Sequence, residues 1–297
     1  MTLRPRQPDR RPTIRPTTRR GPGASPGRRS RAVRRASAGL SPVRAGAILV
    51  MLMCAAAVYG VANSTVFEAR TIAVEGTVLT DAAAISAAVE DVRGQNLFTL
   101  LTRPLEDRVR RIPTVRGVVV SVRLPETLVV RIRERTAILV WQLGARRYLV
   151  DADGRLFAIV PDSASPSVAA LPVIDDRRAG SVGLAVGLQI DPVDLDAATR
   201  LGSLAPADVG SQAQGLAVSI SDVNGFTVRS RPASWQAVFG FYTPTLRTPA
   251  LVPGQVRLLR SLLIGREPLV DRIILASETD GTFTTKPSPS PSASPAP

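Results

Sequence analysis

The sequence predicts an α+β protein built from five successive parts. These are a disordered basic N-terminal tail (1–44), a single transmembrane helix (45–67), a small β-α-α-β-β domain (68–136), a mixed β-rich second domain with two helices (137–285), and a disordered Pro/Ser tail (286–297). Three observations carry this prediction: one long uncharged apolar run, a pair of Val-rich alternating segments preceded by two amphipathic ones, and several later hairpin signals.

The first 44 residues are strongly basic. They contain thirteen Arg and one acid, Asp9, so they hold most of the net charge of +14. Few apolar residues and many Pro and Ser predict disorder. We interpret this tail as a topology signal and solubilising segment. Contact with anionic lipid, nucleic acid or an acidic partner is the alternative, but no aromatic residues interleave the Arg residues for base stacking, so no nucleic-acid partner is expected.

The apolar run from Ala45 to Ala62 contains 18 uncharged residues. As a helix it extends about 27 Å, close to the roughly 30 Å hydrocarbon core of a bilayer. A cleaved signal peptide has a shorter basic region and a shorter apolar run, and a lipoprotein site at Cys54 requires a small residue where Met53 stands. The absence of charge beside a basic tail also disfavours a buried core helix. The Arg excess before the run places the N-terminus in the cytoplasm and the bulk of the chain outside it.

The composition excludes several kinds of catalytic site. There is no His and only one Cys, which excludes Ser-His-Asp and Cys-His catalysis, His-ligated zinc and an intrachain disulfide. The only Lys, Lys286, lies in a Pro/Ser-rich stretch where a Ser/Lys dyad would lack a pocket to lower the pKa of the Lys. We therefore expect no enzymatic activity, no catalytic residue, no cofactor, no metal and no small-molecule substrate.

The first domain begins with a strand and two helices. The strand covers Arg70–Val74, and a helix at about 82–91 is capped by Thr80 or Asp81. The second helix follows Thr102 as its predicted N-cap and ends at Pro113. Its buried stripe consists of Leu105, Val109 and Ile112.

A hairpin completes the first domain. In "VRGVVVSVRLPETLVVRIRERTAILVW" (115–141), Val and Leu occupy one face of two strands and Arg recurs on the other. A three-residue loop, 125–127, is predicted to set Leu124 opposite Leu128 and Val122 opposite Val130. A two-residue loop would mix the buried and exposed sets. The Arg residues then lie on the solvated face.

These segments resemble the polypeptide-transport-associated (POTRA) domain and, more specifically, the FtsQ/DivIB family of bacterial division proteins. The resemblance rests on Asn-Leu-Phe before the second helix (96–98), "IPTVRGVVV" (112–120) and Trp141, together with the hairpin residues Pro125, Thr127, Leu128, Glu134 and Arg135. Two departures are Leu124, where the family often has an aromatic residue, and the lack of a Pro after Glu134-Arg135.

The second domain contains hairpin signals at Asp151–Gly154 and Asn224–Gly225. Its other predicted elements are strands at 171–176, 235–242, 269–277 and 282–285 and helices at 193–204 and 253–265. Asp151 and Asp153 lack the further ligands of a calcium loop, so we interpret them as part of a solvated turn. Residue 162 and its neighbours in "PDSASPSV" are predicted to form a loop.

The resemblance implies a bitopic membrane scaffold of the septal cell-division complex, located in the cytoplasmic membrane at the division septum. Its implied partners are FtsB-like and FtsL-like single-span proteins and the septal peptidoglycan synthases. The family's contact for the FtsB-like partner points to Arg272, Ile273, Ile274, Leu275, Ala276, Ser277, Thr282, Phe283, Thr284 and Thr285. Their backbone would bind an added strand, because Ile273, Ile274 and Leu275 fit a core strand. The alternative function is a POTRA-type envelope assembly or secretion component that handles extended substrate segments.

Overall fold

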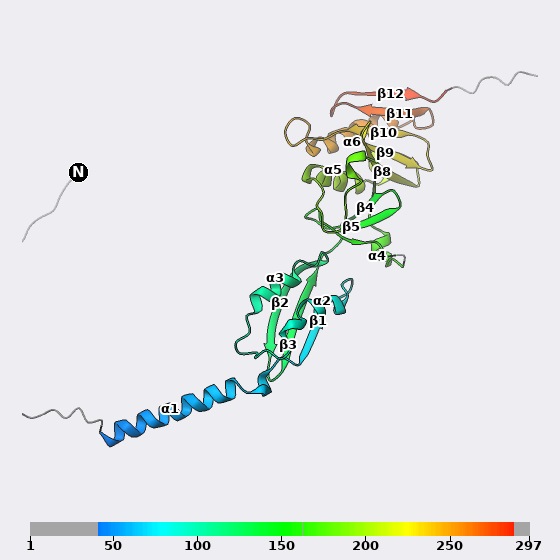
Figure 1. Cartoon of the computed structure of the whole chain (residues 1–297). Helices are drawn as coiled ribbons and strands as arrows, with labels where there is room; N and C mark the ends of the chain where they lie inside the picture. The colour runs from blue at the N-terminus through cyan, green and yellow to red at the C-terminus, as the bar shows by residue number, and fades with distance from the viewer. Residues whose placement is uncertain (1–40, 162, 288–297) are drawn as a thin grey trace, which may run out of the picture. The chain divides into compact units, whose positions relative to one another are not determined.

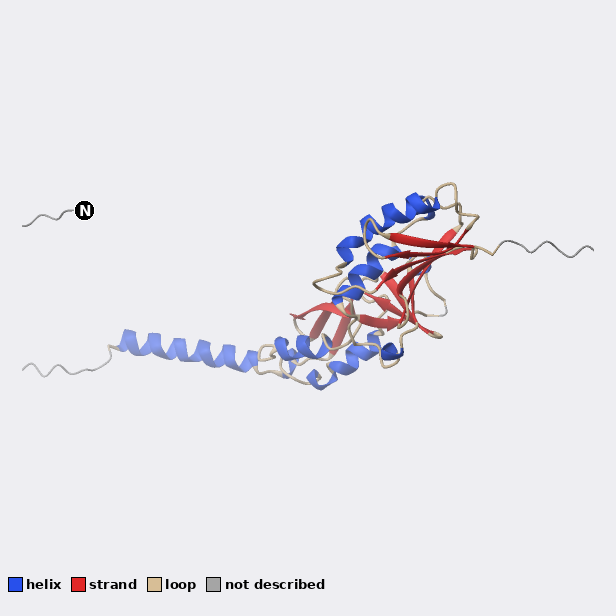
Figure 2. Ribbon diagram, turned by 90° about the horizontal axis from the view of Figure 1, so that it is seen from above, coloured by secondary structure: helices blue, strands red, loops and turns tan. Residues whose placement is uncertain are grey.

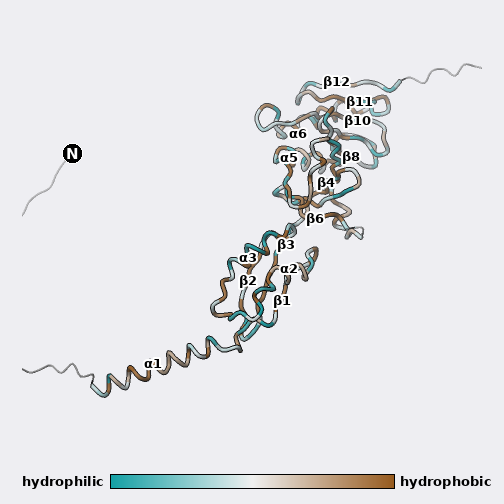
Figure 3. The backbone as a smooth tube through the Cα atoms, viewed as in Figure 1, coloured by the Kyte–Doolittle hydropathy of each residue, from teal (hydrophilic) through white to brown (hydrophobic). Residues whose placement is uncertain are grey.

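The computed structural model describes residues 41–161 and 163–287. The predicted disorder of residues 1–40 and 288–297 lies outside this range. Helix α1 (Pro42–Ala62) has no buried residue, and Figure 3 shows hydrophobic residues along it. Of the described helices it alone is long and apolar enough to cross a membrane. It begins three residues earlier than predicted and ends five residues earlier, because the 3-10 turn η1 (Thr65–Phe67) follows, with the Ser64 side chain as its cap.

A three-stranded sheet follows α1, with two helices packed on it (Figure 1). Its strands are β1 (Thr71–Glu75), β2 (Val115–Arg123) and β3 (Thr127–Glu134), in the order β1-β3-β2, and β1 is parallel to β3. The helices are α2 (Ala82–Ala88) and α3 (Thr102–Val109). The core is lined by Ile85, Val89, Leu105, Val109, Val118, Val120, Leu128, Val130 and Ile132.

Both helices of this domain differ slightly from the prediction. The helix expected at 82–91 stops at Ala88, and the 3-10 turn η2 (Glu90–Val92) follows, which allows both Val89 and Val92 to be buried. Asp81 is the N-cap, and its carboxylate accepts a hydrogen bond from the Ala83 amide at 2.9 Å. Thr102 is the first residue of α3 and not its cap; the cap position is Leu101.

The hairpin has the predicted faces but not the predicted register. Val122 lies opposite Leu128 and Val120 opposite Val130, so the strands are shifted by two residues and the loop is 124–126. A shift of two residues leaves every side chain on its face, so alternation alone cannot exclude it. The tertiary structure selects it because the Glu126 carbonyl accepts hydrogen bonds from the amides of Arg70 and Thr71, at 2.9 and 3.1 Å.

The rest of the chain forms a nine-stranded sheet in the order β12-β11-β10-β9-β8-β7-β4-β5-β6. Its strands are β4 (Leu139–Leu143), β5 (Arg146–Val150), β6 (Leu156–Ile159), β7 (Val173–Asp176), β8 (Gly215–Ser221), β9 (Gly225–Arg231), β10 (Gln236–Gly240), β11 (Val270–Leu275) and β12 (Gly281–Thr285). The pairs β4-β7, β7-β8 and β10-β11 are parallel and the others antiparallel.

Helices α5 (Pro192–Gly202) and α6 (Val252–Leu263) lie on one face of this sheet (Figure 2). They enclose the main core, which includes Trp141, Leu201, Phe239, Leu259 and Ile273. A smaller core of Val140, Leu149 and Phe157 lies on the opposite face, where Val168 packs against it. Val168 belongs to α4 (Pro166–Ala169), a short helix in the segment predicted as a loop. Pro166 at the first turn favours this helix because its ring already has a helical φ.

Candidate functional site

The last two strands form the edge of the nine-stranded sheet. Among the described strands, β12 pairs only with β11, in an antiparallel ladder that sets Ile273 opposite Phe283 and Ile274 opposite Thr282. The predicted partner-binding residues therefore lie together: 272–275 in β11, Ala276 and Ser277 in the turn, and 282–285 in β12. The outer side of β12 has no strand beside it in the described chain.

The backbone groups of β12 alternate between the ladder and its outer side. The Lys286 amide donates to the Leu269 carbonyl at 2.8 Å, and the Asp280 carbonyl accepts from the Ala276 amide at 2.9 Å, so residues of even number face β11. Alternation then directs the N–H and C=O groups of Gly281, Phe283 and Thr285 outward. Within residues 41–161 and 163–287 no strand pairs with these groups, so an extended segment of another chain could form main-chain hydrogen bonds with them.

The side chains of this hairpin divide between two faces. Ile273 and Leu275 are buried in the main core. Phe283 lies opposite Ile273 and therefore on the same face, where 40% of it is exposed. Ile274, Thr282 and Thr284 lie on the other face, where Ile274 is 44% exposed. An added strand could thus contact exposed apolar groups on both faces.

Two side chains fix the C-terminal end of β11 against β10. The Arg247 guanidinium donates to the carbonyls of Phe239 at 2.6 Å and Leu275 at 2.8 Å, and also to that of Ala276. The Gln255 amide donates to the same Leu275 carbonyl at 3.2 Å and accepts from the Tyr242 hydroxyl at 2.7 Å. Burial raises the pKa of Tyr242, which therefore stays a donor. These bonds hold the strand on which β12 depends.

Lys286 fixes the other end of β12. Its Nζ donates to Ser234 Oγ and to the Pro268 carbonyl, both at 3.0 Å. It lines an open cavity of about 1230 Å³ together with Ser234 and Glu267, although its own stretch of the sequence is rich in Pro and Ser. The reason is tertiary: β12 carries Lys286 to the loops before β10 and β11. Because Nζ donates both hydrogen bonds, we interpret its contact with Ser234 as one that holds the end of β12 in place.

Glu267 forms the polar wall of this cavity. Its carboxylate accepts from Ser211 Oγ at 2.5 Å, from the Gln212 amide at 2.8 Å and from Trp235 Nε1 at 2.8 Å. Burial alone would raise the pKa of Glu267, but these hydrogen bonds outweigh it and lower the pKa. The wall is therefore a satisfied anionic network beside Lys286.

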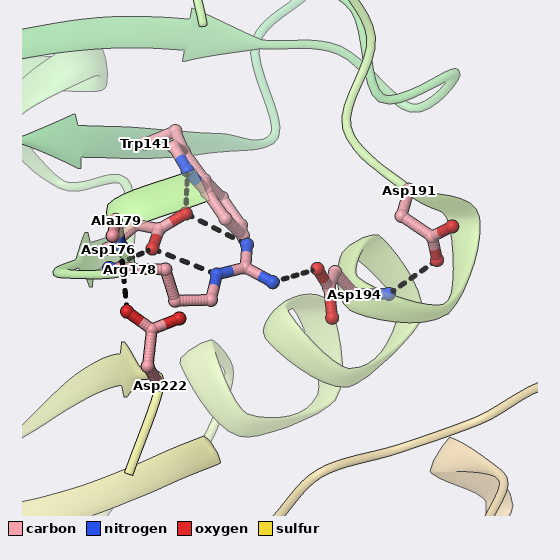
Figure 4. Close-up of polar contacts among 7 residues, drawn as sticks. All are labelled: Trp141, Asp176, Arg178, Ala179, Asp191, Asp194 and Asp222. Atoms are coloured by element: carbon pink, nitrogen blue, oxygen red, sulfur yellow. Dashed lines mark hydrogen bonds and ion pairs between the residues drawn. The ribbon is translucent and has the colours of Figure 1, made fainter. Parts of the chain in front are cut away.

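A buried ionic network, missed by sequence reasoning, lies where the parallel strands β4, β7 and β8 end (Figure 4). Asp176 is fully buried and accepts from Trp141 Nε1 at 3.1 Å and from Arg178 Nη2 at 2.8 Å. Arg178 Nη1 also reaches Asp194 at 2.6 Å. Asp176 and Arg178 border an open cavity of about 680 Å³. The signal in the sequence is Asp-Asp-Arg-Arg (175–178) directly after a buried strand.

The Arg178 hydrogen bonds set the charge of this network. Burial alone would raise the pKa of Asp176, but the hydrogen bonds from Arg178 and Ser181 lower it. The pKa of Arg178 is raised, since its two carboxylate partners outweigh the effect of burial. All the polar groups at this position are paired with one another, so we interpret the network as a structural support for the strand ends.

The hairpin residues quoted for the family resemblance also have structural contacts. Pro125 lies in the loop, Thr127 pairs with Arg123, and Leu128 is buried. The Glu134 carboxylate accepts from the amides of Val78 at 3.0 Å and Thr80 at 2.7 Å, which close the loop before α2. Burial would raise the pKa of Glu134, but these hydrogen bonds lower it.

Arg135 makes an ion pair that corrects the interpretation of the Asp151 turn. Its guanidinium binds Asp151, whose side chain is fully buried, and its Nε donates to the Pro113 carbonyl at 3.1 Å. Asp151 also accepts from the amides of Asp153 at 3.0 Å and Arg155 at 2.9 Å. The turn is thus not solvated at Asp151. Across residues 41–161 and 163–287, no group of three or more His, Cys, Asp or Glu is placed to hold a metal.

Comparison with known proteins identifies the first domain. Residues 67–135 match the family described as POTRA domain, FtsQ-type. The "Cell division protein FtsQ" of Chloroflexus aggregans is 27% identical over 220 residues, which cover 74% of this chain and 72% of that protein.

Shorter matches point to the same family. The proteins named "Cell division protein FtsQ" from Rickettsia bellii and Rickettsia felis are 25% and 26% identical over 97 residues, 33% of this chain. The match spans only about a third of the length of these Rickettsia relatives, 36%. The matched segment 67–135 contains the β-α-α-β-β unit, and the apolar helix α1 precedes it. Both features agree with the sequence matches. Residues 67–135 therefore form an FtsQ-type POTRA domain, and the chain is similar to proteins named "Cell division protein FtsQ" over up to 74% of its length.

Proposed function

We propose that this protein is a bitopic membrane scaffold of the septal division complex that binds other division proteins through the outer edge of β12. The observation that carries the proposal is the outer main-chain edge of β12, which has no strand beside it in the described part of the chain. The last strands of this sheet are held by Arg247, Gln255 and Lys286. A rigid, preorganised edge lowers the entropic cost of adding a strand.

The remaining parts of the chain support this role. In the proposal, residues 1–44 lie in the cytoplasm, because Arg residues preceding a span are retained on that side. Residues 68–136 and 137–285 then form two domains outside the cytoplasm. The protein acts through protein–protein contacts and not through catalysis, so it links or recruits FtsB-like and FtsL-like proteins and regulates septal peptidoglycan synthases.

The names of the relatives support a role in cell division, and the domain count does not favour the alternative. An envelope assembly or secretion component that handles extended substrates would be expected to repeat its POTRA unit. The described residues contain one β-α-α-β-β unit and one separate nine-stranded sheet.

The test removes one outward backbone donor from β12 without removing the strand. Deletion from β11 onward is unsuitable, because it removes buried core residues such as Ile273 and Leu275. Thr285→Pro removes an outward N–H, which an edge strand tolerates, whereas Thr285→Val keeps it. We expect Thr285→Pro to reduce co-purification of the FtsB-like protein severalfold from membranes, and Thr285→Val to leave it at the wild-type level.

Two controls make this result decisive. Thermal unfolding of both variants should match the wild type, because neither change touches the main core. Septal fluorescence of a full-length fusion should decrease with Thr285→Pro in step with co-purification. Equal binding by the two variants would show that the partner does not use the β12 backbone, and a diffuse membrane pattern for the wild type would refute the septal role.

A further inference from the structure

The C-terminal end of α1 is bonded to a loop more than thirty residues further along the chain. Asn96 Nδ2 donates to the carbonyl of Ala62, the last residue of α1, at 2.5 Å. The Leu97 amide donates to the Phe67 carbonyl at 2.8 Å, and the Ala69 amide to the Gln95 carbonyl at 2.9 Å. Residues 95–97 are therefore held beside the segment that leaves the membrane span.

An aromatic pair extends this contact to the outside of the domain. The rings of Phe67 and Phe98 meet edge to face, with their centroids 4.9 Å apart. The Asn96 side chain also accepts from the Phe98 amide at 2.9 Å, which sets the direction of the loop. Despite these contacts, Phe98 is 54% exposed; Val66, which precedes Phe67, is 57% exposed, and Leu101, three residues after Phe98, is 75% exposed. Exposed apolar side chains thus occur both just after α1, at Val66, and in and just after the loop that is bonded to its end, at Phe98 and Leu101.

Their depth follows from the length of α1. Its 21 residues extend about 31 Å at about 1.5 Å per residue, which fills a hydrocarbon core of about 30 Å. The headgroup layer outside that core is roughly 5 to 8 Å thick on each side. Asn96 contacts the last residue of α1 directly, and two residues of chain span at most about 7 Å, so Phe98 is near enough to reach that layer.

We propose that Val66, Phe98 and Leu101 form a lipid-binding surface that enters the headgroup–acyl boundary of the outer leaflet and fixes the POTRA domain on the bilayer. Transfer of apolar side chains from water into this boundary lowers the free energy. Arg70 and Arg93 stand beside the surface, because the Gly94 amide donates to the Ala69 carbonyl at 3.0 Å and Arg93 Nη1 to the Arg70 carbonyl at 2.8 Å. Arg70 pairs with Glu126 at 3.8 Å and Arg93 with Glu90 at 2.5 Å, but their side chains are 59% and 50% exposed, so the exposed N–H groups suit lipid phosphates.

A lipid surface fits these residues better than a protein partner does, because the surface is continuous with the membrane-spanning helix. The surface also supplies a role for the Asn-Leu-Phe stretch that β12 binding does not use: Asn96 joins the loop to the span and Phe98 joins it to the lipid. The proposal depends on α1 as the anchor and is independent of any partner at β12.

The experiment measures contact with lipid in the full-length protein. The chain is reconstituted in phosphatidylcholine vesicles whose acyl chains carry bromine near the headgroup, and fluorescence quenching is compared for Phe98→Trp and Val78→Trp. Val78 is 90% exposed and bonds Glu134 beyond the far end of β1, so it is the control. The wild type, with its buried Trp141 and Trp235, gives the baseline. We expect severalfold stronger quenching at position 98 than at position 78.

A second tryptophan position tests whether the quenching is only a local effect of the substitution at position 98. Leu101→Trp leaves the Phe67–Phe98 pair intact and should also be quenched more than Val78→Trp. Equal quenching at positions 78, 98 and 101 in vesicles free of other proteins would overturn the proposal. So would protection of positions 98 and 101 that appears only after a division protein is added, since this would assign the surface to a protein partner.

Discussion

Arg178 holds the carboxylate of Asp176 with two parallel hydrogen bonds, 3.0 Å from Nε to Oδ1 and 2.8 Å from Nη2 to Oδ2. Asp176 is fully buried, and its carboxylate also accepts hydrogen bonds from Trp141 Nε1 at 3.1 Å and from the Arg178 amide at 3.0 Å. The hydrogen bond from Trp141 joins Asp176, the last residue of β7, to the centre of β4. A bidentate pair of this kind imposes geometry as well as charge.

Removing Arg178 should destabilise the large sheet strongly. Arg178→Met leaves Asp176 charged and buried, and loss of one partner of a buried pair costs about 3–5 kcal/mol. The matched control is Arg177→Met, because Arg177 is exposed and its pair with Asp175 contributes about 0–1 kcal/mol. Urea unfolding at pH 7 measures both. Similar free energies of unfolding for the two variants would show that the network does not support the fold.

Glu134 should make the stability of the POTRA domain depend on pH. Its pKa is lowered in the folded state, so its contribution is present above the unfolded pKa of about 4.3 and is lost as pH falls through the folded value. Glu134→Gln should lower the free energy of unfolding by about 1–3 kcal/mol at pH 7, because the amides of Val78, Leu79 and Thr80 lose a charged acceptor. The difference from the wild type should disappear in acid.

Glu75→Gln is the control for this pH dependence. Glu75 is on the surface and pairs with Arg131 at 2.9 Å, so its effect at pH 7 should be within about 1 kcal/mol. Urea unfolding at neutral and acid pH compares the two variants. A constant difference between wild type and Glu134→Gln at every pH would contradict the prediction.

Gly225 should be essential for the hairpin of β8 and β9. Its φ is +61°, and a Cβ atom there would stand 2.3 Å from the Gly240 carbonyl carbon. Gly225→Ala combines a left-handed backbone conformation, which costs about 1–2 kcal/mol, with a backbone clash. The control is Gly215→Ala, where no atom lies within 4 Å of the added Cβ, and its effect should stay within about 0.5 kcal/mol. Thermal unfolding that fails to separate the two variants would contradict this account.

Lys286 should control how firmly β12 is held. Lys286→Met removes both Nζ hydrogen bonds, to Ser234 and to Pro268, so the end of β12 should open more often. Hydrogen exchange of the inward amides of Thr282 and Thr284 should accelerate, since local opening governs exchange. Amides of β2 and β3 serve as the internal control and should keep the wild-type rate. Unchanged exchange in β12 would show that the β11 ladder alone holds the strand.

Local sequence patterns determine much of this fold because they act over a few residues. The uncharged apolar run determines α1, and alternation of Val with polar residues determines which faces of β2 and β3 are buried. The Asn224–Gly225 turn determines the β8-β9 hairpin, since a Gly is favoured where φ is positive. The family resemblance in the segment 96–141 likewise rests on local motifs.

The tertiary structure decides what depends on residues far apart in the chain. The hairpin register is set by the contact of Glu126 with Arg70 and Thr71, and the burial of Asp151 by its ion pair with Arg135. The cavity at Lys286 exists because β12 returns beside the loop before β10.

The candidate sites show the same division. The sequence alone predicts that 282–285 form the last strand and that 96–98 belong to the family motif. Only the three-dimensional structure places β12 at the edge of a nine-stranded sheet and Asn96 at the end of α1. The physical reason is that periodicity records which face of an element is apolar, whereas strand order and long-range hydrogen bonds depend on how all the elements pack together.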